Sequence, residues 1–85
     1  MSDEQPRFYF RHGCHLCEEM AAVLFRGWPD VAESMQWIDI DSSAKLTEEY
    51  QSRIPVLWNA GEVVCELEAD LIRLRRSFGD PRLPV

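Results

Sequence analysis

FYFRHGCHLCE, residues 8–18, carries a short apolar run directly into a helix-like segment. The aromatic residues Phe8–Phe10 are typical of a buried strand. Beyond them, apolar residues recur at helical spacing and predict a helix over about residues 14–25. Two cysteines, Cys14 and Cys17, therefore stand where a strand gives way to a helix, and Gly13 supplies a residue that can turn sharply between the two.

The position of this C-x-x-C pair predicts redox chemistry. The first turn of a helix has unpaired N–H groups and the positive end of the helix dipole. A cysteine at that place can be held as a thiolate, the form that attacks disulfides. Cys17 lies one turn further on the same face, within reach to close a disulfide with Cys14. A protonated His15, inside the motif, would lower the pKa of Cys14.

The same residues leave a metal site open as an alternative. Cys14 and Cys17, with His12 and His15 close by, would make half of a zinc site. A second pair of ligands at zinc-finger spacing is missing from the sequence, which favours the redox interpretation.

The rest of the chain predicts an α/β domain of order β-α-β-α-β-β-α. Strands are expected at residues 7–11, 35–40, 55–58 and 63–67. Helices are expected at residues 14–25, 44–51 and 68–78, where residues 27–30, with Pro29, end the first helix and residues 41–43 cap the second. Arg73, Arg75 and Arg76 near the end of the last helix would complement its dipole. The first two strands are joined through a helix and should be parallel, whereas the last two should form an antiparallel hairpin. The expected architecture is a four-stranded mixed sheet with three helices, in a single domain over residues 1–85 with its core at about 7–78 and short flexible tails, the first being Met1–Pro6.

Composition narrows the class of function. The 85 residues carry a net charge of −6, which disfavours binding to nucleic acid or to an anionic membrane surface. We see no apolar run near the ~20 residues that span a bilayer. The first residues also lack the features of a signal peptide, so a cytoplasmic location is expected. Three cysteines are too few for a secreted disulfide scaffold. Separately, the chain is expected to be a monomer.

The order of these elements, with C-x-x-C opening the first helix and Ile54-Pro55 opening the third strand, resembles the glutaredoxin and thioredoxin superfamily. The resemblance is closest to small glutaredoxin-like proteins with a Gly-Cys-His-Leu-Cys-Glu motif. The matching segments are residues 8–18, 37–41, 53–57 and 61–64. Together they span nearly the whole chain between residue 7 and about residue 74, in the order and spacing of that superfamily.

The resemblance implies a thioredoxin-like fold and a thiol–disulfide oxidoreductase. Cys14 would be the nucleophile and Cys17 the resolving thiol. Pro55 would be a cis-proline facing the dithiol, with the backbone of Ile54 pairing with a substrate. Arg11 would be the basic residue that glutaredoxins often carry ahead of the motif. Substrates would be disulfides of proteins or small molecules; no bound cofactor is implied, and electrons would come from glutathione or a reductase.

Departures and alternatives remain. Where glutathione-using glutaredoxins have a Gly-Gly turn before the last helix, this chain has the acidic segment 67–70. One alternative is a thioredoxin-fold binding module that holds zinc or an iron–sulfur cluster through Cys14, Cys17 and another chain. Another is an adaptor that keeps the groove at Pro55 without turnover, although such a protein would need neither cysteine. Cys65, in a predicted strand, is interpreted as a half-buried small residue, with a secondary redox thiol as the other interpretation.

Overall fold

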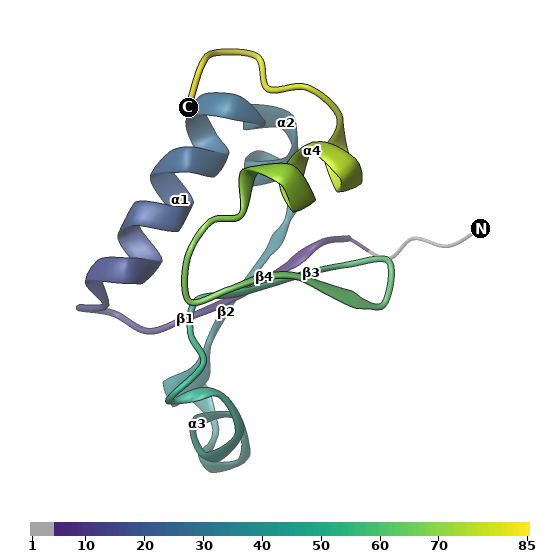
Figure 1. Cartoon of the computed structure of the whole chain (residues 1–85). Helices are drawn as coiled ribbons and strands as arrows, with labels where there is room; N and C mark the ends of the chain where they lie inside the picture. Colours follow the sequence, from purple (N-terminus) through teal and green to yellow (C-terminus); the bar gives the residue numbers. More distant parts are fainter. Residues whose placement is uncertain (1–4) are drawn as a thin grey trace.

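The computed structural model describes residues 5–85, so most of the predicted leader Met1–Pro6 lies outside the described residues. Its centre is a four-stranded sheet in the order β2-β1-β3-β4 (Figure 1). The strands are β1 (Arg7–Phe10), β2 (Gln36–Asp39), β3 (Val56–Asn59) and β4 (Glu62–Glu66). β1 pairs with β2 in parallel, whereas β1 with β3 and β3 with β4 are antiparallel. The predicted mixed sheet and its hairpin are confirmed.

Four helices cover the sheet, one more than predicted. They are α1 (His15–Gly27), α2 (Pro29–Ser34), α3 (Ala44–Tyr50) and α4 (Leu71–Phe78), with a 3-10 turn at Ile40–Ser42. Figure 1 shows α1, α2 and α4 on one face of the sheet and α3 on the other. The chain thus forms a layered α/β structure in which the first turn of α1 lies at one end of the sheet.

The additional helix α2 corrects the expectation that residues 27–30 only end a helix. Trp28 closes α1, since its N–H donates to the carbonyl of Leu24 at 2.8 Å, and the same residue caps the start of α2. Pro29 then occupies the first position of α2, where a missing N–H costs nothing and the fixed φ of proline suits a helix.

The start of α4 is a second correction, because the helix begins at Leu71 and not near Glu68. Asp70 is its N-cap, and its carboxylate accepts the N–H of Arg73 at 3.1 Å. Ahead of it, Leu67 has a positive φ of 73° and the N–H of Glu68 donates to the carbonyl of Glu66 at 2.8 Å. This turn occupies the backbone of residues 67–70, so they do not join the helix.

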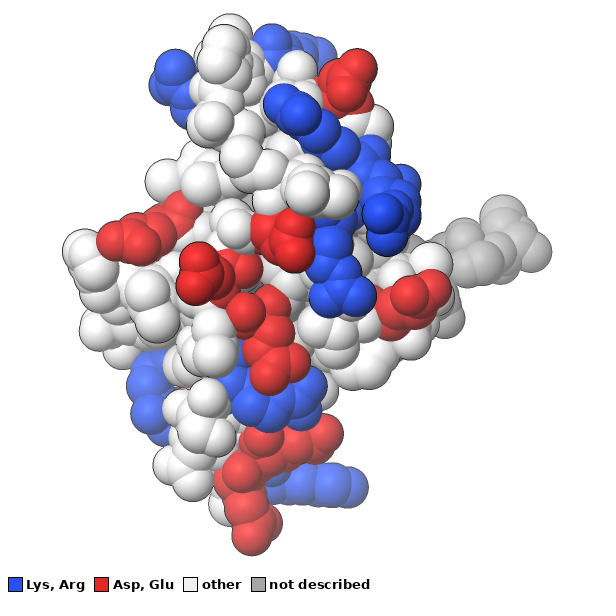
Figure 2. Space-filling model, viewed as in Figure 1, with Lys and Arg blue, Asp and Glu red and all other residues white. Residues whose placement is uncertain are grey.

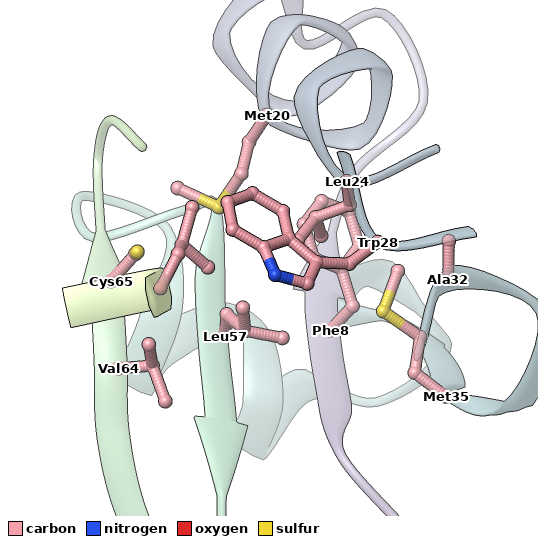
Figure 3. Packing of buried hydrophobic residues seen from close by; sticks show 10 residues of the cluster. Phe8, Met20, Leu24, Trp28, Ala32, Met35, Leu57, Val64 and Cys65 are labelled. Atoms are coloured by element: carbon pink, nitrogen blue, oxygen red, sulfur yellow. The ribbon is translucent and has the colours of Figure 1, made fainter. Parts of the chain in front are cut away.

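Two apolar clusters, one on each face of the sheet, form the core. The larger lies between the sheet and α1, α2 and α4, and includes Phe8, Leu24, Leu57 and Leu74 (Figure 3). The smaller lies on the α3 side and includes Tyr9, Ile40, Tyr50, Ile54 and Val56. Successive residues of a strand point to opposite faces, so β1 contributes Phe8 to one cluster and Tyr9 to the other.

Charge is unevenly distributed on the face shown in Figure 2. Basic side chains gather over α4 and acidic ones lie beside them, toward the sheet. Arg75 and Arg76 stand in the last turn of α4, where cations complement the helix dipole, as the sequence predicts. Within residues 5–85, we find no helix that is both long enough and apolar enough to cross a membrane.

Candidate functional site

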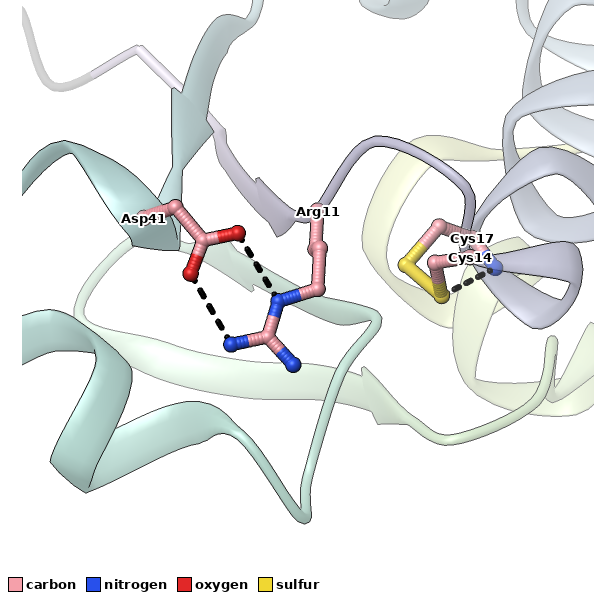
Figure 4. The surroundings of a disulfide bond; sticks show 4 residues. All are labelled: Arg11, Cys14, Cys17 and Asp41. Carbon is pink, nitrogen blue, oxygen red and sulfur yellow. Dashed lines mark hydrogen bonds and ion pairs between the residues drawn. A yellow bond between two sulfur atoms is a disulfide. The ribbon is translucent and has the colours of Figure 1, made fainter.

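The two cysteines of the C-x-x-C motif are joined in a disulfide across the first turn of α1 (Figure 4). Their Cα atoms are 5.2 Å apart. Cys14 is the N-cap of α1, with extended backbone, and its Sγ accepts the N–H of Cys17 at 3.1 Å. Gly13 turns the chain into this cap with a φ of 80°, a conformation that favours glycine. The strand–turn–helix junction predicted from the sequence is therefore present.

The two sulfur-bearing residues differ in burial. Cys14 is half-buried at the surface, whereas Cys17 is only 4% exposed. Cys17 belongs to the smaller core cluster with Tyr9 and Ile54, and Cys14 packs against the same cluster. An incoming molecule thus meets Cys14 first, while the core holds Cys17 behind it.

The start of α1 also sets the electrostatics at Cys14. The helix N-terminus offers N–H groups to negative charge on Cys14 Sγ, as the hydrogen bond from Cys17 illustrates. Glu18 stands exposed in the first helical turn, where its carboxylate favours the helix but opposes a neighbouring thiolate. The helix N-terminus and the Glu18 carboxylate therefore have opposite effects on a thiolate at Cys14.

Pro55 follows a cis peptide bond from Ile54, as the resemblance implies. Both residues are buried, and Ile54 shares a cluster with Cys17. The backbone here is already hydrogen-bonded: the N–H of Ile54 donates to the carbonyl of Tyr50 at 3.1 Å, and the carbonyl of Pro55 accepts the N–H of Leu67 at 2.8 Å. A substrate strand that pairs with Ile54 through its N–H must therefore displace Tyr50.

Arg11 lies between the disulfide and Asp41, as Figure 4 shows, and its guanidinium is engaged with that carboxylate. Its Nε and Nη2 donate to the two oxygens of Asp41, each at 2.9 Å. This hydrogen bond raises the pKa of Arg11 and lowers the pKa of Asp41. Thr47 adds a contact of 3.3 Å to the same carboxylate. The pair ties the end of β1 to the 3-10 turn that follows β2.

The two histidines near the motif are both turned toward carboxylates. His15 Nε2 lies 2.9 Å from Glu19 Oε2, one helical turn along α1. His12 Nε2 lies 3.5 Å from Asp39 Oδ2, with its ring edge-on to Phe10. Both rings are exposed at the surface. Of the predicted site residues, the structure brings Cys14, Cys17 and Ile54 into one cluster, places Arg11 next to the disulfide, and directs His15 along the helix.

Sequence reasoning missed Asp41 and Trp37 as parts of this region. Asp41 was interpreted as helix-capping chemistry, but the N-cap of α3 is Ser43, whose Oγ accepts the N–H of Leu46 at 3.0 Å. Trp37 lies in a predicted strand, where ordinary packing is expected, yet it is 42% exposed beside α1. The available signal was the parallel pairing of the first two strands, which brings residues that follow β2 next to residues that follow β1.

Cys65, the third cysteine, is separate from the disulfide and more deeply buried than predicted. It is 1% exposed, and its Sγ accepts the N–H of Asp70 at 3.3 Å. Burial raises the pKa of the Cys65 thiol, which keeps it in its unreactive protonated form.

Comparison with known proteins places this geometry in a family. The model of the family described as Glutaredoxin-like domain (DUF836) matches residues 7–78. Among solved structures, the X-ray structure of the structural genomics target protein XcR50 from X. campestris is 30% identical, with a TM-score of 0.67 over 84% of this chain and 91% of that one. The solution NMR structure of protein Ne2328 from Nitrosomonas europaea is also 30% identical, with a TM-score of 0.59 over 93% of this chain and 95% of that one. No curated protein matches the chain.

Proposed function

Since the chain belongs to the glutaredoxin-like domain family, we propose that it is a thiol–disulfide oxidoreductase whose redox centre is the Cys14–Cys17 pair. One observation carries the proposal: a disulfide closes the first turn of α1, with one sulfur-bearing residue near the surface and the other in the core. A structural disulfide between residues only 3 apart in sequence would stabilise the fold very little, because a cross-link removes less entropy from the unfolded chain when the loop it closes is short.

The reaction takes two exchange steps. The Cys14 thiolate attacks one sulfur of a substrate disulfide, forms a mixed disulfide with it, and releases the other substrate sulfur as a thiolate. Cys17, after losing its proton, then attacks Cys14 Sγ, closes the intramolecular disulfide and releases the second substrate thiolate. Two electrons pass from the protein dithiol to the substrate, which leaves the protein in the oxidised form described above.

The neighbouring residues have supporting roles in this proposal. The N–H of Cys17 and the N-terminus of α1 stabilise the thiolate on Cys14. The Ile54-Pro55 segment forms the wall of the substrate site on the α3 side of the sheet. We propose Arg11 and His15 as substrate-binding residues, which can meet a substrate by exchanging or sharing their contacts with Asp41 and Glu19.

Return to the dithiol requires two electrons from outside the chain. We propose glutathione or the dithiol of a reductase as the donor, and we propose no bound cofactor. The expected setting is the cytoplasm, where such donors are abundant. The protein would act on disulfides of other proteins or of small molecules.

The metal-binding alternative depends on residues from another molecule. Within residues 5–85, no group of three or more His, Cys, Asp or Glu side chains is placed to hold one metal ion. A zinc or iron–sulfur site through Cys14 and Cys17 would need its remaining ligands from a second chain. Metal analysis of the purified protein separates this alternative from the proposed dithiol enzyme.

The decisive experiment is a redox titration in defined glutathione buffers, in which free thiols are trapped by alkylation and counted by mass. We expect a single two-electron transition in the wild type. It should disappear in Cys14→Ser and persist in Cys65→Ala, the matched control for a buried cysteine away from the pair. Cysteines that stay unoxidised across the range, or become reactive only after a chelator is added, would refute the enzyme and favour the metal module.

A further inference from the structure

An open groove lined by aromatic side chains runs between α1 and the edge strand β2, on the face of the sheet opposite α3. We call it the aromatic groove. It is lined by Phe8, Phe10, Gly13, Cys17, Ala21 and Trp37. Because Gly13 and Cys17 are among the lining residues, the groove lies beside the Cys14–Cys17 pair.

Trp37 lines the aromatic groove on the β2 side and contacts three other aromatic rings. It sits opposite Phe8 in the parallel register of β1 and β2. Its ring meets Phe8 edge-on at 4.9 Å and Phe10 edge-on at 5.9 Å, and it stacks on Phe25 at 5.9 Å. Even so, Trp37 is 42% exposed and Phe25 is 47% exposed. Because β2 is an edge strand, no further strand covers these rings, and a rigid apolar surface faces the solvent.

The charged groups at the mouth of the aromatic groove leave a negative balance. Arg11 is paired with Asp41, and His12 Nε2 lies 3.5 Å from Asp39 Oδ2, so both side chains already contact a carboxylate. Glu18 also borders the groove, and it has no ion-pair partner among residues 5–85. An apolar side chain with a cation next to it would therefore suit this site better than an anion.

We propose that the aromatic groove binds an aromatic or large aliphatic side chain of a polypeptide substrate, located a few residues from the cysteine that exchanges with Cys14. This inference rests on the proposed function. A polypeptide bonded to Cys14 would lie next to the groove, since Gly13 precedes Cys14 in the chain, Cys17 is its disulfide partner, and both line the groove. Burial of one large apolar side chain is a strong enough contact to distinguish substrates. Glutathione has no such side chain and would gain nothing from the groove.

The test compares two peptide disulfides that differ at one position, where one has phenylalanine and the other serine. With the wild type we expect a kcat/KM at least about tenfold higher for the phenylalanine peptide, the size of discrimination that an apolar pocket gives. Trp37→Thr, which keeps a strand-forming residue, and Ala21→Gln, which fills the groove from the helix, should both bring this ratio toward one. Ile72→Ser, on the exposed surface of α4, is the matched control and should retain it.

A binding measurement makes the result independent of catalysis. The same phenylalanine peptide with serine in place of its cysteine should quench or shift the tryptophan emission of the wild type, and Trp37→Thr should abolish the change. If neither peptide disulfide is reduced but this binding is seen, the groove assignment is supported and the proposed oxidoreductase function is refuted. If both peptides are reduced equally and the tryptophan emission is unchanged, the oxidoreductase function is supported and the groove assignment is wrong. A concentration-dependent dimer that Trp37→Thr dissociates would assign the groove to a second copy of the chain and overturn the proposal.

Discussion

The assignment of Cys14 as nucleophile predicts an order of alkylation for the three cysteines of the reduced protein. Cys14 should react first, Cys17 second and Cys65 last. Cys14 is half-buried at the start of α1, whereas Cys17 is 4% and Cys65 1% exposed. One molecule thus offers three thiols in three environments, and each is an internal control for the others.

The size of the differences follows from the thiolate fraction and from burial. A thiol of ordinary pKa, ~8.5, is about 3% thiolate at pH 7, so a helix start that favours the thiolate can raise the reactive fraction of Cys14 by up to about 30-fold. Cys65, which is buried, can be alkylated only when the core opens. A domain of this size has a free energy of unfolding of at least ~4 kcal/mol, which corresponds to about a thousandfold protection. Its raised pKa slows Cys65 further.

The assay is limited alkylation of freshly reduced protein with iodoacetamide at pH 7, followed by peptide mapping at several times. The same reaction in concentrated urea is the control, because unfolding should make the three rates similar. Labelling of Cys17 as fast as Cys14 would refute the division of roles between nucleophile and resolving thiol. Labelling of Cys65 on the time scale of Cys14 would refute the burial argument.

Three further predictions concern the scaffold around the site. The hydrogen bond with Arg11 lowers the pKa of Asp41, so the pair should stabilise the fold above the unfolded pKa of ~3.9 and lose this effect as the pH falls through the lower pKa of the folded state. Asp41→Asn should therefore lower the urea midpoint at pH 6 and have little effect at a pH below both pKa values. Trp28→Phe removes part of a buried ring and the 2.8 Å hydrogen bond from the indole N–H to the carbonyl of Gly79, which should lower the free energy of unfolding in urea by about 1–3 kcal/mol. An unchanged urea midpoint would mean that this hydrogen bond does not stabilise α4. Gly13→Ala should cost about 1–2 kcal/mol because of its φ of 80°, since the added methyl group meets no atom within 4 Å beyond the adjoining residues. Chemical denaturation would measure this cost, and a neutral result would show that the turn relaxes.

The sequence predicted the junction at the site because local patterns determine it. The aromatic run, a glycine and helical spacing beyond the cysteines each point to strand, turn and helix in that order. The prediction of helix boundaries from the sequence failed where one residue type occurs both at helix starts and at helix ends. Pro29 was interpreted as a helix terminator, but proline starts helices equally well, and it begins α2. The start of α4 was misplaced because residues 67–70 are compatible with a helix until the cap at Asp70 is recognised.

The contacts of Arg11 and Trp37 lay beyond local patterns, since both depend on how distant strands pair. Arg11 meets Asp41, 30 residues away, because Phe10 and Asp39 are partners in the parallel register of β1 and β2. The same register sets Trp37 against Phe8 at an open edge of the sheet, where an alternating strand pattern alone suggests ordinary packing.

These two contacts together bear on which substrates the site favours. A guanidinium beside the dithiol would attract the carboxylates of a small anionic substrate, but Arg11 already donates two hydrogen bonds to Asp41. An anion arriving there must compete with a carboxylate held in place by the fold, and it must also approach the exposed Glu18. Neither cost applies to an apolar side chain that enters the aromatic groove against Trp37. The local balance of charge and apolar surface therefore favours a polypeptide disulfide over a small acidic one, even though both would undergo the same exchange at Cys14.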